Sequence, residues 1–122
     1  MTISCSIDHD RRYVEAIASG PVSCEEVRTH LLEERSKHGL GYAELIDGRS
    51  ANPNWSTSQT REIVELLRNF GLDSRLGPTA VVVPNDYAFG MLRMLEILLE
   101  DICIVRPFRD FDAAKQWLRC LP

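Results

Sequence analysis

Apolar and polar residues follow strand-like and helix-like periods in successive segments of the chain. The most apolar stretch runs from Thr79 to Glu100. It begins with the continuous run Ala80–Val83, which predicts a strand covered on both faces. A helix is expected from about Tyr87 to about Leu99, where apolar residues go most of the way around a helical projection. Its polar side chains share an arc of roughly 60° and are Arg93, Glu96 and Glu100.

The N-terminal segment has the period-2 alternation of strands. Apolar residues alternate with polar ones over residues 3–7, and a second strand is expected over Tyr13–Ala18. A polar turn at residues 8–11 joins the two, and Gly20–Pro21 is expected to end the second strand. This pair predicts an antiparallel hairpin at the edge of a sheet.

Three further helices are predicted from their start signals. Ser23 with Glu26, and Ser56 with Gln59, match capping boxes, and Asp110 is a third N-cap. The side chains expected to face the core are Cys24, Val27, Leu31 and Leu32, then Ile63, Leu66, Leu67 and Phe70, then Phe111, Ala114, Trp117 and Leu118.

Two more strands complete the predicted fold. They are expected at Tyr42–Ile46, followed by a polar loop, and at Ile102–Val105. A hairpin followed by alternating helices and strands predicts an α/β fold with a mixed sheet and right-handed crossovers. We expect a single domain over residues 1–122.

Composition limits the class of protein. With 44% hydrophobic and 26% charged residues in 122, the chain is typical of a soluble globular domain. A net charge of -4 argues against nucleic-acid binding. No apolar run reaches the roughly 20 residues of a membrane span, and the N-terminus lacks the pattern of a signal peptide. We therefore expect a cytoplasmic protein.

The cysteine and histidine residues show no metal-site or catalytic spacing. Cys5, Cys24 and Cys103 are expected to be small core residues, and Cys120 is expected to be the most exposed thiol. The histidines His9, His30 and His38 are expected at the surface. Nucleophile, metalloprotease and nucleotide-binding motifs are also absent from the sequence. The sequence therefore predicts no catalytic residue, no metal and no cofactor.

Three segments carry a resemblance to a known family. They are AELIDGR, GPTAVVVPNDYAFGMLRML and FRDFDAAKQWL. Together with the order of elements, they resemble the SpoIIAA-like superfamily, which includes STAS and CRAL-TRIO domains. In particular, the chain looks like the small stand-alone bacterial STAS/CRAL-TRIO-like proteins, most of which have no assigned activity. The resemblance implies a SpoIIAA-like fold and a protein-interaction role.

The resemblance also points to one candidate regulatory segment. In anti-sigma factor antagonists of the superfamily, a serine at the start of the helix after the third strand is phosphorylated, which switches binding to a partner kinase. The matching residues here are Ser56, Thr57 and Ser58. The D-S-S-G pattern of those proteins is absent.

Polar residues after the predicted strands form a candidate ligand site. In α/β sheets, ligands bind beyond the carboxyl ends of the strands. There, arginines and the start of a helix could hold an anion. Alternatively, the aspartates cap turns or helices and the arginines pair with them. The candidates are Asp47, Arg49, Ser56, Thr57, Ser58, Asn85, Asp86 and Arg106.

The helix of residues 87–99 carries a candidate subunit interface. We expect Tyr87, Met91, Met94 and Leu98 to face the sheet, which leaves a flank formed by Leu92, Leu95 and Leu99. An exposed patch of leucines is typical of a partner site, and a symmetric homodimer is the commonest way to cover it. The alternative is that adjacent helices bury this flank within the monomer.

Two hypotheses on function follow. The first is a non-catalytic, STAS-like interaction module that acts as a homo-oligomer and has a regulatory protein partner. The second is a protein that binds a small molecule, a lipid head group or an anion at the carboxyl ends of its strands.

Overall fold

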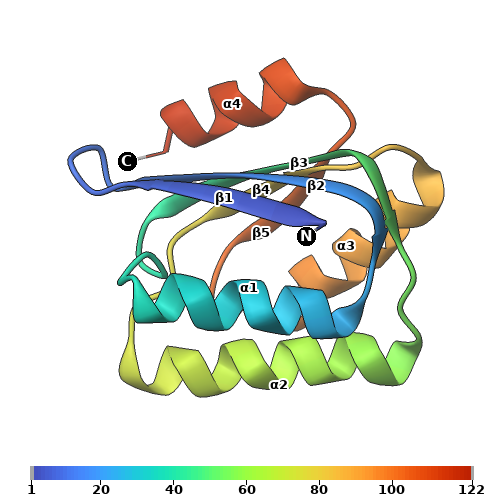
Figure 1. The fold of residues 1–122 in the computed structure, drawn as a ribbon, viewed down its shortest axis with the longest axis horizontal. Helices are drawn as coiled ribbons and strands as arrows, with labels where there is room; N and C mark the ends of the chain where they lie inside the picture. Colours follow the sequence, from blue (N-terminus) through green and yellow to red (C-terminus); the bar gives the residue numbers. More distant parts are fainter. Residues whose placement is uncertain (1, 122) are drawn as a thin grey trace.

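The computed structural model describes residues 2–121, which form a five-stranded sheet and four helices (Figure 1). The strands lie side by side in chain order. The hairpin β1–β2 is antiparallel and every later pair is parallel, so the predicted mixed sheet is confirmed. The elements are β1 (Ile3–Asp8), β2 (Tyr13–Val22), α1 (Cys24–Ser36), β3 (Ala43–Pro53), α2 (Thr57–Asp73), β4 (Thr79–Val82), α3 (Asp86–Leu98), β5 (Val105–Phe108) and α4 (Phe111–Arg119).

Helices cover both faces of the sheet. Figure 1 shows α1 and α2 beneath the sheet and α4 above it. On the α4 side, Leu45, Val82 and Ala114 form a small core. The larger core lies on the other side, where α2 and α3 pack against β4 and β5 around residues such as Ile63 and Leu99.

The predicted helix starts are confirmed. The Ser23 hydroxyl accepts a hydrogen bond from the Glu26 amide at 3.2 Å, and the Ser23 amide donates to the Glu26 carboxylate at 3.4 Å. Ser56 and Gln59 form the same reciprocal pair at α2. Asp110 caps α4 by accepting from the Ala113 amide at 2.9 Å. These caps satisfy amides that have no partner inside their helices.

Strands β2 and β3 run further than the sequence predicts. The prediction that Gly20–Pro21 ends β2 is wrong, as is the polar loop expected after Ile46. The register shifts between Ile17 and Ser19, and parallel pairing then resumes as far as Val22 and Pro53. This irregularity lets both strands continue, and Gly20 fits there because its φ of 69° is left-handed.

Strand β5 begins three residues later than predicted. The amides of Ile102 and Cys103 both donate to the Leu99 carbonyl, at 2.8 and 3.0 Å, so this apolar segment continues the turn after α3. Pairing with β4 starts only at Val105, opposite Thr79. An apolar run alone does not separate a buried turn from a strand.

Gly48 lies where β3 closely approaches the Val82 carbonyl group of β4. A Cβ atom at this position would stand 2.8 Å from the Val82 carbonyl oxygen, which belongs to rigid sheet backbone. Gly90, inside α3, has open space around it instead. The two glycines therefore provide a matched pair for testing the packing of the sheet.

We expect Gly48→Ala to lower the free energy of unfolding by about 1–3 kcal/mol, because the added methyl group overpacks the sheet. Gly90→Ala should leave it unchanged or raise it by up to about 1 kcal/mol, because alanine favours the helix. Urea unfolding followed by circular dichroism measures both. Equal effects of the two substitutions would contradict this account of β3.

Candidate functional site

Three ionisable side chains are buried together between α1 and β3. His30, Glu34 and Glu44 are 7%, 3% and 6% exposed. His30 Nε2 lies 3.0 Å from Glu44 Oε2 and 3.6 Å from Glu34 Oε2. The three atoms lie within 4.8 Å of one another. We call this group the polar cluster.

The local structure explains why these side chains meet. His30 and Glu34 are four residues apart on α1, so they project from the same face of the helix. Glu44 lies opposite the buried Val14 in the parallel β2–β3 pair. Because side chains alternate along a strand, the next residue, Leu45, points to the α4 side and leaves Glu44 facing α1.

Burial dominates the electrostatics of the cluster. It raises the pKa of the Glu34 carboxyl to about 9, with a further contribution from the negative charge of Glu44 and an opposing one from His30. Burial also raises the pKa of Glu44, to about 7, although a hydrogen bond with Glu34 opposes the rise. Desolvation disfavours an ionised carboxylate, and two adjacent carboxylates disfavour each other. We therefore expect the pair to keep at least one proton at neutral pH.

The hydrogen bonding of the cluster is incomplete. Glu44 Oε2 is within hydrogen-bond distance of His30 Nε2, but Glu34 Oε2 is buried and has no hydrogen-bond donor among residues 2–121 unless it shares a proton with Glu44. Its 3.6 Å separation from His30 Nε2 is too long for a hydrogen bond. A buried polar atom without a partner costs free energy, so this oxygen is a natural contact point for a ligand atom.

The polar cluster borders a cavity of about 160 Å³, which we call the central cavity. It lies between the sheet and helices α1, α2 and α3, and its wall is mostly apolar. Val27, Trp55, Leu67 and Leu95 are among the residues that form the wall. The cavity therefore offers an apolar space with a polar group at one side.

A second hollow, of about 410 Å³, lies between the edge strand β1 and α1. We call it the β1–α1 groove. Residues His30 and Glu34 line this groove as well as the central cavity. The charged residues along the groove are Glu25, Glu26, Glu33, Glu34 and Lys37. The charged side chains of the groove are thus mainly acidic, and the groove reaches the polar cluster from outside.

The chemistry available at the cluster is that of one imidazole and two carboxyl groups. Carboxylate oxygens accept hydrogen bonds from hydroxyl and amine groups. Imidazole and carboxylate are also ligands for divalent transition metals. The residues that could hold a metal are His30, Glu34 and Glu44.

Asp47 and Arg49, which were predicted to follow the third strand, lie inside β3 and pair with each other. Arg49 makes two hydrogen bonds to the Asp47 carboxylate, at 2.9 and 2.8 Å, and these hold the pKa of Asp47 below its usual value. Arg49 also lies over the ring of Phe111. Arg106 is the second residue of the edge strand β5, opposite Ala80, and so does not follow the carboxyl end of its strand. The Asp47–Arg49 pair matches the alternative reading of the sequence.

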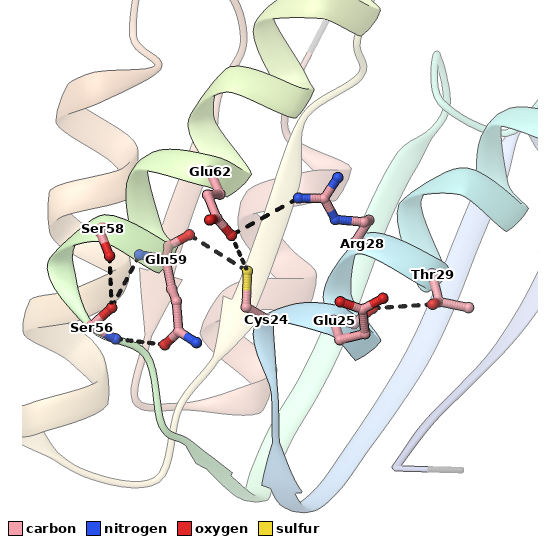
Figure 2. Close-up of polar contacts among 8 residues, drawn as sticks. All are labelled: Cys24, Glu25, Arg28, Thr29, Ser56, Ser58, Gln59 and Glu62. Atoms are coloured by element: carbon pink, nitrogen blue, oxygen red, sulfur yellow. Dashed lines mark hydrogen bonds and ion pairs between the residues drawn. The ribbon is translucent and has the colours of Figure 1, made fainter.

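Ser56, Thr57 and Ser58 lie at the start of α2 (Figure 2). The Ser56 hydroxyl is engaged with the Gln59 amide and lies 3.2 Å from the Ser58 hydroxyl. Figure 2 also shows Cys24, whose thiol lies near Gln59 and Glu62. Burial and the charge of Glu62 raise the pKa of this thiol. The three exposed hydroxyl residues are not brought together with Arg49 or Arg106 by any hydrogen bond among residues 2–121.

Asn85 and Asp86 also have structural partners. The Asn85 side chain caps α3 by accepting from the Ala88 amide at 2.9 Å. Asp86 pairs with Arg109, which also donates to the Pro84 carbonyl at 3.3 Å. An anion site at the strand ends remains a prediction that would require these pairs to open.

The expected orientation of α3 is wrong. Leu92, Leu95 and Leu99, predicted to form an uncovered flank, are only 6%, 4% and 0% exposed. They belong to the core formed with α2 and β5, which includes Ile63 and Val105. The flank is thus buried within the monomer, as the alternative reading held, and these leucines are not a free surface.

The opposite side of α3 is exposed instead. Tyr87 and Met94, predicted to face the sheet, are 66% and 41% exposed, and Leu98 is 38% exposed. Ile97 adds to the same side of the helix at 52% exposed. Met91 is buried as predicted. We call Tyr87, Met94, Ile97 and Leu98 the α3 apolar face.

Sequence reasoning missed the polar cluster because it counted only apolar residues along α1. His30 was expected at the surface and is buried, whereas Leu32, expected in the core, is exposed. Cys5 is also exposed, contrary to expectation, while Cys24 is buried and Cys120 exposed as predicted. The available signal was the H-x-x-x-E spacing of His30 and Glu34, which places both side chains on the same helix face as Val27 and Leu31.

Comparison with known proteins identifies the architecture. No family model and no curated protein matches the chain. A solved structure from Shewanella loihica PV-4, an uncharacterized protein of the DUF3478 family with a SpoIIAA-like fold, superposes with a TM-score of 0.60. The superposition covers 95% of this chain and 93% of that one, at 18% sequence identity. The fold is SpoIIAA-like.

The SpoIIAA-like fold confirms the resemblance seen in the sequence as far as architecture is concerned. The Shewanella protein has no described activity, so the similarity leaves function to be argued from the site. None of the helices found in residues 2–121 has the length and apolar character needed to cross a bilayer.

The polar cluster is expected to make the free energy of unfolding fall as pH rises. In metal-free protein, the folded state holds protons that the unfolded state loses near pH 4.5, because the pKa values of Glu34 and Glu44 are raised to about 9 and about 7. The stabilising contribution is therefore fully present below about pH 4.5 and is lost as pH rises towards 9. Urea unfolding at about pH 5, 7 and 9 measures the fall.

Glu34→Gln removes one of these titrations and replaces the acid with a neutral amide. We expect this variant to show a flatter pH dependence and, near pH 9, to exceed the wild type by roughly 1–3 kcal/mol. The control is Glu33→Gln, because Glu33 is an exposed neighbour on α1. Parallel pH profiles for wild type and Glu34→Gln would show that Glu34 is not buried as described.

Proposed function

We propose that this chain is a non-catalytic binding module that holds a small, mainly apolar molecule with one hydrogen-bond donor in the central cavity. One observation carries the proposal. The buried atom Glu34 Oε2, on a residue that lines this apolar cavity, has no hydrogen-bond donor in the part of the chain that the structure describes unless it shares a proton with Glu44. A ligand donor such as a hydroxyl or amine would satisfy the oxygen while its apolar body fills the cavity.

The size of the cavity sets the size of the ligand. Its volume of about 160 Å³ is close to that of an engineered protein cavity of about 150 Å³ that binds benzene. The ligand group inside the cavity is therefore about the size of one six-membered ring. The apolar wall formed by Val27, Leu67 and Leu95 favours an uncharged ring.

The proposed role is binding without catalysis. Cys103 is the cysteine that lines the cavity, and burial raises the pKa of its thiol. A protonated thiol is a poor nucleophile. The polar cluster contributes acids and an imidazole, and a buried carboxyl that keeps its proton suits hydrogen bonding to a ligand.

Matched ring compounds test this proposal. With EDTA present to exclude metals, we expect benzylamine and benzyl alcohol to raise the melting temperature more than toluene does. A bound ligand at a tenfold excess over its Kd adds about 1.4 kcal/mol of stability. Phenylacetate should have no effect because its carboxylate would meet Glu34 and Glu44. Inorganic phosphate, which probes the strand-end anion site, should also have no effect.

Val27→Phe is the variant that fills the cavity and leaves the polar cluster intact. We expect it to abolish the shifts caused by benzylamine and benzyl alcohol, with Ile17→Phe on the exposed side of β2 as the control. The proposal fails if the wild type responds equally to all four ring compounds, or if Val27→Phe responds like the wild type.

A second candidate function is self-association through the α3 apolar face. Tyr87, Met94 and Leu98 are spaced by seven and four residues, so they form one stripe along α3. Exposed apolar stripes of this kind are typical of protein-protein contacts. A second copy of this chain, related by a two-fold axis, would cover the stripe with the same stripe. Such an interface would also suit a regulatory module.

Met94→Glu tests this second function. We expect the wild type to be a dimer at micromolar concentration and Met94→Glu to be a monomer, because a charge at the centre of the stripe opposes its burial. Ile17→Glu is the control, since Ile17 is 55% exposed and lies on β2, away from α3. Size-exclusion chromatography with light scattering distinguishes the states. A monomeric wild type would remove the self-association hypothesis and leave cavity binding untouched.

A further inference from the structure

The donor atoms of the polar cluster have the spacing of a metal coordination sphere. Zinc binds histidine nitrogen and carboxylate oxygen at about 2.0–2.2 Å, so tetrahedral ligand atoms lie about 3.4 Å apart. His30 Nε2 lies 3.0 Å from Glu44 Oε2 and 3.6 Å from Glu34 Oε2. All three atoms fall within 4.8 Å of one another. Small side-chain rotations would bring them to equal distance from one ion.

The two buried carboxyl groups of the cluster share a single imidazole as their ion-pair partner. Among residues 2–121, the ion-pair partner of both Glu34 and Glu44 is His30, and neither carboxylate pairs with a lysine or arginine. Glu34 Oε2 is in addition without a hydrogen-bond partner, although its residue is only 3% exposed. A divalent cation would supply both the missing positive charge and a contact for this oxygen.

The surface offers a route for a cation. The β1–α1 groove leads to His30 and Glu34, and its lining includes Glu25 and Glu33 with Lys37 as its one basic residue. An acidic groove attracts cations and raises their local concentration. Entry through this groove does not require passage through the apolar central cavity.

We infer that His30 Nε2, Glu34 Oε2 and Glu44 Oε2 form a binding site for one divalent transition metal ion of the zinc class. The imidazole ligand favours zinc, cobalt or iron over magnesium and calcium, which prefer oxygen atoms alone and more of them. Three protein ligands leave a fourth position for water or a small ligand. The ion and the proposed ring ligand both use Glu34 Oε2, so a bound ion would compete with the ligand's donor group for this oxygen, although the ring itself lies in the cavity and not in the cluster.

Zinc titration of the full chain tests the site. After EDTA treatment and dialysis, calorimetric titration with Zn²⁺ should show one ion bound per chain in the wild type. We expect Glu34→Gln and His30→Gln each to weaken binding by at least about tenfold, because even an outer-shell change costs about that much. Glu65→Gln is the matched control, since Glu65 is an exposed carboxylate on α2 that lines neither the groove nor the central cavity, and this variant should bind within about threefold of the wild type. Circular dichroism confirms that each variant is folded.

X-ray absorption at the zinc edge identifies the ligands independently of affinity. We expect a shell of nitrogen and oxygen at about 2.0–2.2 Å and no sulfur shell at about 2.3 Å. Cys5 lines the β1–α1 groove, so Cys5→Ser controls for a thiol ligand and should bind like the wild type. Absence of zinc binding, a sulfur shell, or binding that survives Glu34→Gln and is lost in Cys5→Ser would overturn the inference.

The two proposals fail separately in these experiments. Val27→Phe should lose the response to benzylamine and keep zinc binding, because it fills the cavity without touching a donor atom. Zinc binding without any response to ring compounds would support the metal site alone. A response to ring compounds in EDTA, with no zinc binding, would support the cavity alone.

Discussion

The carboxyl groups of Glu34 and Glu44 are buried against one face of the sheet, and His30 is their shared ion-pair partner. Several local features hold them there. The capping box at Ser23 fixes where α1 begins, and the 100° rotation per residue then decides that His30 and Glu34 face inwards. On the sheet, the parallel register with β2 places Glu44 opposite Val14. A different helix start would rotate these acids away from the sheet.

The central cavity has its own structural cause in the extended parts of β2 and β3. At the register shift and just after it, the residues Ala18, Gly48 and Ala51, which line the cavity, are small. The indole of Trp55 fixes this end of the sheet by donating to the Val22 carbonyl at 2.9 Å. Small residues on the sheet opposite α1 and α2 leave a volume that the larger helical side chains do not fill.

Much of the fold could be predicted from the sequence, because caps and alternation are local signals. The starts of α1, α2 and α4 and the antiparallel hairpin are cases in which neighbouring residues determine the structure. The face of α3 that packs against the core could not be predicted, since apolar residues surround most of that helix. Packing against α2 and β5 selected Leu92 and Leu95 for the core and left Tyr87 exposed. Such a choice depends on distant elements.

The candidate site was harder to predict, because its residues are polar where the pattern demands apolar ones. A periodicity count on α1 favours Leu32 for the core, whereas the structure buries Glu34. The contact with Glu44 joins α1 to β3, and that pairing exists only after the chain folds. The strand-end residues, by contrast, were visible in the sequence because ligands of α/β sheets bind there.

The contrast between these two groups of charges decides where a ligand is expected. Among the predicted strand-end residues, Asp47 is paired with Arg49 and Asp86 with Arg109, so neither pair gains from a ligand unless it opens. In the polar cluster, Glu34 is buried more deeply, and no lysine or arginine among residues 2–121 pairs with its carboxyl group. Apolar residues of similar volume would fill such a position at lower cost. Departures from local consistency are concentrated at functional sites, and this one lies beside both a cavity and an acidic groove.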